Sequence, residues 1–242
     1  MDMKAFLKNY NFTIILLAIM IIITTVVLSM GQSTMIGVPN LNIAMMIVLV
    51  AVGLAAGLLG GWIGTGGCSV MLPVLHFWLG FPAPIAVGTT LFAVIFTAIS
   101  GGYGHFKQKN LDKRVALWMG GAGILGVIIG SWLFTFLSSK STLLGFIIGI
   151  VFLWPSFRMI WEGIVGYKNS KSSPGAPVSP PQDQSIKGQP EQLSIFGGIV
   201  GVLTGIVGLG GGYALVPGLI YLFGAPVYIT MGTSLAIMVP MA

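Results

Sequence analysis

Two stretches of this sequence repeat each other: GLLGGWIGTGGCSVMLPVLHFWLGFPAPIAVGTTLFAVIF at 57–96 and GVLTGIVGLGGGYALVPGLIYLFGAPVYITMGTSLAIMVP at 201–240. They align without a gap at a constant offset of about 144 residues, and about a third of the aligned positions are identical. The matched glycines, prolines and threonine are Gly64, Gly66, Gly67, Pro73, Gly80, Pro82, Gly88 and Thr89, and then Gly208, Gly210, Gly211, Pro217, Gly224, Pro226, Gly232 and Thr233. Glycine and proline determine backbone conformation, and apolar composition alone would not align them. The two stretches are therefore an internal repeat.

The composition indicates that this repeat lies in a lipid bilayer. Of the 242 residues, 55% are hydrophobic and 7% are charged. A soluble domain has about a quarter of its residues charged, so the apolar runs here must face lipid or one another. The net charge of +6 does not indicate nucleic acid, because the basic residues stand at the ends of apolar runs. The single cysteine, Cys68, excludes an intrachain disulfide and a site with several thiolates.

The apolar runs divide the chain into membrane spans. The uncharged run 12–30 is long enough to cross about 30 Å of hydrocarbon, and we interpret it as a retained helix, a cleaved signal peptide being the alternative. Further predicted spans are two helical pieces of Asn42–Leu79 around a glycine-rich break, then Pro84–Ser100, Val115–Leu137 and Thr142–Trp161. The predicted domains are an N-terminal helix with an external loop (1–41), a first repeat (42–165), a flexible cytoplasmic linker (166–193) and a second, incomplete repeat (194–242).

The basic residues predict how the spans are oriented. Lys4 and Lys8 precede the first span, so we expect the N-terminus in the cytoplasm and the uncharged segment 31–41 outside. Two later basic groups are also predicted to be cytoplasmic: Lys107, Lys109, Lys113 and Arg114, and then Lys168, Lys171 and Lys187. The first repeat then starts outside and the second starts in the cytoplasm. The predicted fold is an all-α polytopic membrane protein with inverted-topology repeats and glycine-broken helices, an architecture of secondary transporters.

The glycine-rich breaks are the predicted substrate site. A broken helix in lipid leaves N–H and C=O groups without partners, so a break persists only where it is buried or lines a polar cavity. Two breaks that face each other would present backbone N–H donors and positive helix ends, which suit a small anion. The predicted substrate-binding residues are Gly64, Gly66, Gly67, Cys68, Thr89, Thr90, Gly208, Gly210, Gly211, Gly212, Thr233 and Ser234. We predict no catalytic residue, metal ligand or cofactor.

Structural alternatives stay open for these residues. Glycine-rich turns also serve tight packing, and a threonine or serine in a membrane helix often bonds the carbonyl four residues earlier. Small residues four apart predict close helix packing at Gly53 and Gly57, at Gly126 and Gly130, and at Gly145 and Gly149. No predicted span contains a buried carboxylate, so charge does not identify the coupling ion.

The sequence resembles the TauE/SafE family of sulfite exporters over about residues 45–242. The segments that carry the resemblance are Gly57–Pro73 (GLLGGWIGTGGCSVMLP), Val87–Thr90 (VGTT), SGGYGHFKQKNLDKRVAL from Ser100, and Gly201–Pro217. The resemblance implies a bacterial or archaeal inner-membrane permease for sulfite, sulfoacetate or related anions, working by alternating access and driven by the proton gradient. The expected partners are a small anion, a coupling proton, the lipid bilayer and a second copy of this chain, and no nucleic acid.

The sequence departs from the family pattern at two places. Cys68 stands where the family usually has a third glycine, so we expect the first half to bind differently. The second copy stops at Ala242, so we expect it to lack the spans that follow the first copy. Two other functions stay open: a non-transporting membrane subunit or assembly factor, and an intramembrane enzyme, for which the sequence offers one cysteine and two scattered histidines, His76 and His105.

Overall fold

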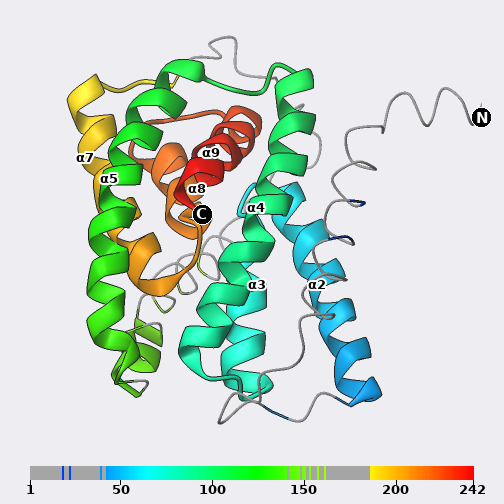
Figure 1. Cartoon of the computed structure of the whole chain (residues 1–242). Coiled ribbons are helices and arrows are strands. Elements are labelled where there is room, and N and C mark those ends of the chain that lie inside the picture. Colours follow the sequence, from blue (N-terminus) through cyan, green and yellow to red (C-terminus); the bar gives the residue numbers. More distant parts are fainter. Residues whose placement is uncertain are drawn as a thin grey trace, which may run out of the picture.

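The regular elements in the described part of the chain are all helices. A computed structural model describes residues 42–140, 142–147, 149–150 and 186–242, together with the single residues 18, 22, 39, 153, 157 and 161. The labelled helices are α2 (Ile43–Ile63), α3 (Cys68–Pro73) with its π-helical continuation η1 (Val74–Trp78), α4 (Ala83–Lys107), α5 (Lys113–Ser138), α7 (Pro190–Val207), α8 (Gly212–Tyr221) and α9 (Val227–Met241) (Figure 1). No strand occurs within these ranges, which confirms the predicted all-α fold.

Four of the described helices, α2, α4, α5 and α7, are long and apolar enough to cross a membrane. Large apolar side chains point away from the protein, and Trp62 and Trp78 are 77% and 86% exposed. Such a surface would not remain dispersed in water, whereas it fits hydrocarbon and the interface. The chain is therefore a multi-pass membrane protein. The predicted span 12–30 and most of the second half of Thr142–Trp161 lie outside the described residues.

Helices α4 and α7 extend by several residues beyond their predicted limits. α4 continues to Lys107, whose Nζ lies 5.0 Å from the centre of the Tyr103 ring one turn earlier. This cation–π contact, and the favourable position of a cation at a helix C-terminus, stabilise the additional turns. α7 begins at Pro190, inside the predicted linker, because proline is well accommodated in the first turn of a helix.

Helices α5 and α7 lie backbone against backbone. A Cβ atom added to Gly126 of α5 would collide with the carbonyl oxygen of Gly198 on α7. One added to Gly201 of α7 would collide with the carbonyl oxygen of Gly123 on α5, and Gly130 is equally close to α7. Glycine is therefore required along both faces of this contact. The prediction of close packing at Gly126 and Gly130 is confirmed.

The other two pairs of small residues do not pack in this way. No described atom lies within 4 Å of a Cβ added to Gly53 or Gly149. Beside Gly57 the nearest atom is Thr97 Cγ2 at 3.8 Å, an ordinary van der Waals distance. A Cβ atom added to Gly145 would meet only the His76 ring, 2.9 Å from Nε2. The spacing of four residues thus identified one close helix contact out of three.

The two copies of the repeat share their backbone conformation. Four pairs of equivalent glycines have positive φ: Gly64 and Gly208 (85° and 72°), Gly66 and Gly210 (69° and 62°), Gly67 and Gly211 (81° and 79°), and Gly80 and Gly224 (73° and 61°). Residues other than glycine rarely adopt this left-handed region. We call residues 64–67 the first break and residues 208–211 the second break. Both breaks follow the same path, since the same positions are left-handed in each.

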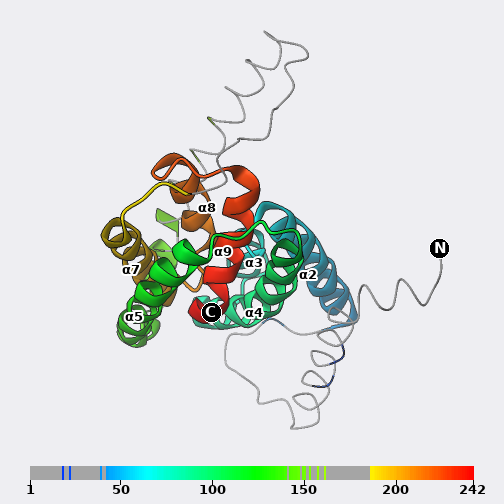
Figure 2. The same cartoon turned by 90° about the horizontal axis from the view of Figure 1, so that it is seen from above.

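Helices α2 and α7, which are equivalent in the two copies, run in opposite directions. In Figure 1, α2 ascends from blue to cyan, whereas α7 descends from yellow to orange. Helix α9 packs against α4, α5 and α8. Figure 2 shows it between the α5–α7 pair and the α2–α4 pair. Opposite directions are what an inverted repeat requires, and the orientation of the copies across a membrane stays a prediction.

Candidate functional site

Each glycine break packs against a helix of the other copy. The first break joins α2 to α3, and the second joins α7 to α8. A Cβ atom added to Gly64 would lie 2.7 Å from Met231 Cα on α9, and one added to Gly208 would lie 3.0 Å from Val87 Cβ on α4. Met231 and Val87 occupy equivalent positions of the repeat. The two contacts are therefore reciprocal, as they are across a two-fold axis.

Two apolar side chains, Val94 of α4 and Met238 of α9, lie between the breaks. They too are equivalent in the repeat, and each contacts both central glycines. A Cβ atom on Gly66 would lie 2.6 Å from Met238 Cε and 3.5 Å from Val94 Cγ1. One on Gly210 would lie 2.9 Å from Met238 Cε and 2.7 Å from Val94 Cγ1. The breaks thus face each other across these two side chains.

The short helices α3 and α8 begin close together. Cys68, the first residue of α3, is fully buried, and its thiol donates a hydrogen bond to the Thr65 carbonyl oxygen (2.9 Å). Gly212, the first residue of α8, approaches the same residue, since a Cβ on Gly212 would lie 2.6 Å from that oxygen. The structure therefore brings the predicted site residues of the two breaks, Cys68 and Gly212 included, into one buried region.

Of the two predicted site residues on α4, Thr90 is buried and Thr89 is not. Thr90 is fully buried, and its hydroxyl donates to the Ala86 carbonyl oxygen four residues earlier (2.7 Å). This is the bond within the helix that was the alternative to substrate binding. Thr89 lies on the exposed face of α4. The structure thus separates Thr89 from the buried breaks.

Their counterparts on α9 are engaged with distant parts of the chain. Ser234 donates a hydrogen bond to the Gly64 carbonyl oxygen in the first break (2.8 Å). The Thr233 hydroxyl accepts one from the Asp112 backbone N–H, in the loop before α5 (3.0 Å). Ser234 is therefore the predicted hydroxyl that directly contacts a break.

Two residues at the breaks were not predicted from the sequence. The Thr97 hydroxyl donates to the Gly66 carbonyl oxygen in the first break (2.7 Å). The Thr204 hydroxyl lies on α7, is fully buried, and has no hydrogen-bond partner among the described residues. A signal was available for Thr204, because it replaces the glycine that stands at the equivalent position, Gly60.

The electrostatics of this region come from backbone and hydroxyl dipoles. Helices α2, α3, α8 and α9 contain no Asp, Glu, Lys or Arg. Within the described ranges, no group of three or more His, Cys, Asp or Glu residues could hold a metal ion. The arrangement therefore offers polar groups to a ligand without a formal counter-charge.

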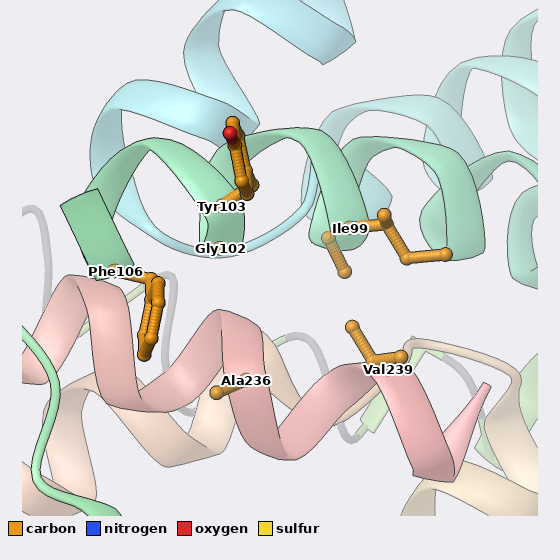
Figure 3. Close-up of a pocket in the computed structure, with 7 residues that line it drawn as sticks. Ile99, Gly102, Tyr103, Phe106, Ala236 and Val239 are labelled. Carbon is orange, nitrogen blue, oxygen red and sulfur yellow. The ribbon is translucent and has the colours of Figure 1, made fainter. Parts of the chain in front are cut away.

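A groove of about 350 Å³ lies between α4 and α9. Figure 3 shows Ile99 and Val239 facing each other across it, with Phe106 at one end. Its lining is almost wholly apolar: Ala98, Ile99, Gly102, Tyr103, Phe106, Ala236 and Val239. The groove contains none of the predicted site residues, and its lining suits acyl or apolar side chains better than an anion.

Comparison with known proteins identifies the family. The family described as Sulfite exporter TauE/SafE matches residues 49–242. The probable membrane transporter protein YunE of Bacillus subtilis is 30% identical over 206 residues, covering 79% of this chain and 73% of that protein. YdhB, a probable membrane transporter protein of the same organism, is 29% identical over 199 residues, covering 82% of this chain and 75% of that protein. No solved structure matches this chain.

Part of this chain is also similar to a plant protein. Sulfite exporter TauE/SafE family protein 3 of Arabidopsis thaliana is 27% identical over 105 residues, covering 43% of this chain and 21% of that protein. The family match covers both breaks and every helix that contacts them, apart from the first six residues of α2. This chain is thus a multi-pass membrane transporter that belongs to the TauE/SafE sulfite exporter family.

Proposed function

We propose that this chain carries a small anion, sulfite or a sulfur-containing organic anion such as sulfoacetate, across a prokaryotic plasma membrane. The observation that carries the proposal is the reciprocal approach of the two glycine breaks, in which equivalent residues of the two copies meet in one buried region. Inverted repeats with broken helices hold substrate at such a place in secondary transporters.

The polar groups of the breaks support an anion as the substrate. Helix α8 starts at the second break, where the N–H groups of Gly210 and Gly212 have no hydrogen-bond partner among the described residues. These groups and the positive end of the helix attract negative charge. The glycines allow a ligand to approach the backbone closely.

Alternating access is the mechanism that the two-fold arrangement supports. In this structure the breaks are buried, and Val94 and Met238 separate them. Related copies exchange their conformations in such transporters, so that the site opens to one side and then to the other. We further propose that the N-terminus lies in the cytoplasm, that a proton is the coupling ion, and that a second copy of the chain is a partner.

Flux into proteoliposomes tests this function. Radiolabelled sulfite, and then sulfoacetate, would be followed with and without a pH gradient. We expect uptake by the wild-type chain, and a loss of at least about tenfold in Gly66→Ala and Gly210→Ala. Each added methyl group would meet Val94 or Met238 at a left-handed backbone position.

The matched control is Gly53→Ala. Gly53 is a helical glycine with no described atom within 4 Å of the added methyl group, so flux should be unchanged. Wild-type protein that is inserted and folded but moves neither anion would contradict the proposed function. Equal flux in all three variants would still support transport by this chain, but it would show that the two breaks take no part in it.

A further inference from the structure

We infer that the transported anion binds at the second break and that the Thr204 hydroxyl donates a hydrogen bond to it. This inference rests on the proposed function and assigns the substrate contact to one of the two breaks. It follows from a difference between the hydrogen bonds of the two breaks and from the position of the Thr204 side chain.

The first break has its carbonyl groups occupied by the protein. Three side chains donate hydrogen bonds to three consecutive carbonyl oxygens: Ser234 to Gly64 (2.8 Å), Cys68 to Thr65 (2.9 Å) and Thr97 to Gly66 (2.7 Å). The backbone is closed as well, because the Gly60 carbonyl oxygen accepts the N–H groups of Gly64 (3.0 Å) and Gly66 (3.1 Å). In the first break, the carbonyl oxygens of residues 64–66 and the Gly66 N–H are thus all bonded within the protein.

The second break lacks these partners. The Gly208 N–H donates to the Thr204 carbonyl oxygen (2.7 Å), as its equivalent does in the first break. The Gly210 N–H does not make the bond that Gly66 makes, and no side chain in the described ranges bonds to residues 208–210. Its Gly210 N–H is therefore available as a donor to a ligand.

The Thr204 side chain points to this break. Its Oγ1 lies 3.0 Å from the position that a Cβ on Gly211 would occupy, beside Val200 Cγ1 at 3.1 Å and Leu215 Cδ1 at 3.3 Å. Thr204 is 0% exposed and its hydroxyl has no partner in the part of the chain that the structure describes. A buried donor among apolar groups is costly unless it is hydrogen-bonded, and a ligand in the break would satisfy it.

The first half has no room for such a donor. The equivalent residue is Gly60, and a Cβ atom there would collide with the backbone nitrogen of Gly67. The second break therefore combines the N-terminus of α8, the unbonded Gly210 N–H and a hydroxyl donor, which together fit an oxyanion such as sulfite.

Thr204→Val and Thr204→Ser test the inference in sulfite flux. The valine variant keeps the volume and loses the hydroxyl, so we expect KM for sulfite to rise about tenfold or more while kcat changes by less than about twofold. The serine variant keeps the donor and should stay within about threefold of wild type. The control is Thr135→Val on the exposed face of α5, where the hydroxyl bonds only to Ser131 of its own helix.

The outcomes separate this inference from the proposed function. Wild type that carries no sulfite or sulfoacetate overturns both. Wild type that carries sulfite, with an unchanged KM in Thr204→Val, overturns the inference alone. A valine variant with an altered sodium dependence and an unchanged KM also overturns it, and assigns the break to a cation. If valine prevents membrane insertion, Thr204→Cys, a weaker donor of similar size, should raise KM and decides the question.

Discussion

The first and second breaks follow the same backbone path, yet they differ in what satisfies their polar groups. In the first, the side chains of Cys68, Thr97 and Ser234 donate to successive carbonyl oxygens. In the second, none of these bonds has a counterpart among the described residues. The counterparts of Cys68 and Thr97 are Gly212 and Met241, which have no hydroxyl or thiol to donate. The glycines therefore determine the path of the chain, and the positions at which the copies differ determine which break is sealed.

Thr90 shows the same difference from the other copy. It is the equivalent of Ser234, but its hydroxyl bonds within its own helix and not to the second break. Ser234, in contrast, donates to the Gly64 carbonyl oxygen as well as to that of Met231 in its own helix. The two breaks therefore have nearly the same backbone path, but the described side chains bond to the carbonyl groups of the first break and not to those of the second.

The largest expected effect comes from placing a methyl group on the third glycine of each break. In Gly67→Ala the new Cβ would meet the Ala56 backbone, with its carbonyl carbon 2.8 Å away, so we expect a loss of about 2–5 kcal/mol of unfolding free energy. In Gly211→Ala it would meet only side-chain atoms at 3.0 Å or more, and the loss should be about 1–2 kcal/mol. SDS-induced unfolding in mixed micelles measures both, and equal losses would contradict the difference described here.

A smaller effect is expected from shortening the two side chains between the breaks. Met238→Ala removes more buried volume than Val94→Ala, so we expect losses of about 2–4 kcal/mol and about 1–3 kcal/mol. Both side chains contact both breaks, so each variant should destabilise the two copies together. Hydrogen exchange of residues 64–67 and 208–211 checks this. Increased exchange in one break only would show that the breaks are not coupled through these side chains.

The smallest and most informative pair removes one threonine hydroxyl at each break. Thr97→Val leaves the Gly66 carbonyl oxygen without its side-chain donor and should cost about 1–3 kcal/mol. Thr204→Val removes a hydroxyl that has no partner among the described residues, so it should be neutral or slightly stabilising. Unfolding free energies in detergent test the pair. A loss in Thr204→Val as large as that in Thr97→Val would show that the second break is sealed like the first.

The sequence was sufficient for the backbone of both breaks and insufficient for their side chains. The repeated glycines predicted the breaks because a left-handed residue is almost always glycine. The partner of Ser234 lies 170 residues away, and a hydroxyl in a helix can equally bond its own backbone, as Thr90 does. Only tertiary packing decides between these partners.

Helix packing was predictable where both faces consist of glycine. Gly126 and Gly130 form a close contact because α7 places Gly201 and Gly205 opposite them. Gly53 has the same spacing to Gly57, but no helix in the described part of the chain lies close to it. The spacing of small residues on one helix is therefore not sufficient to predict a close contact. Small residues are also needed on the helix that packs against it.

The contact between α5 and α7 also affects how this molecule can move. Helix α5 belongs to the first copy and α7 begins the second, yet their backbones touch along several turns without interlocking side chains. Separating the two helices would lose close dispersion contact over the whole face. We therefore expect α5 and α7 to move together as one rigid body. The hinges of the protein would then lie beside α9. The parts that move as rigid bodies would therefore differ from the two copies of the sequence repeat.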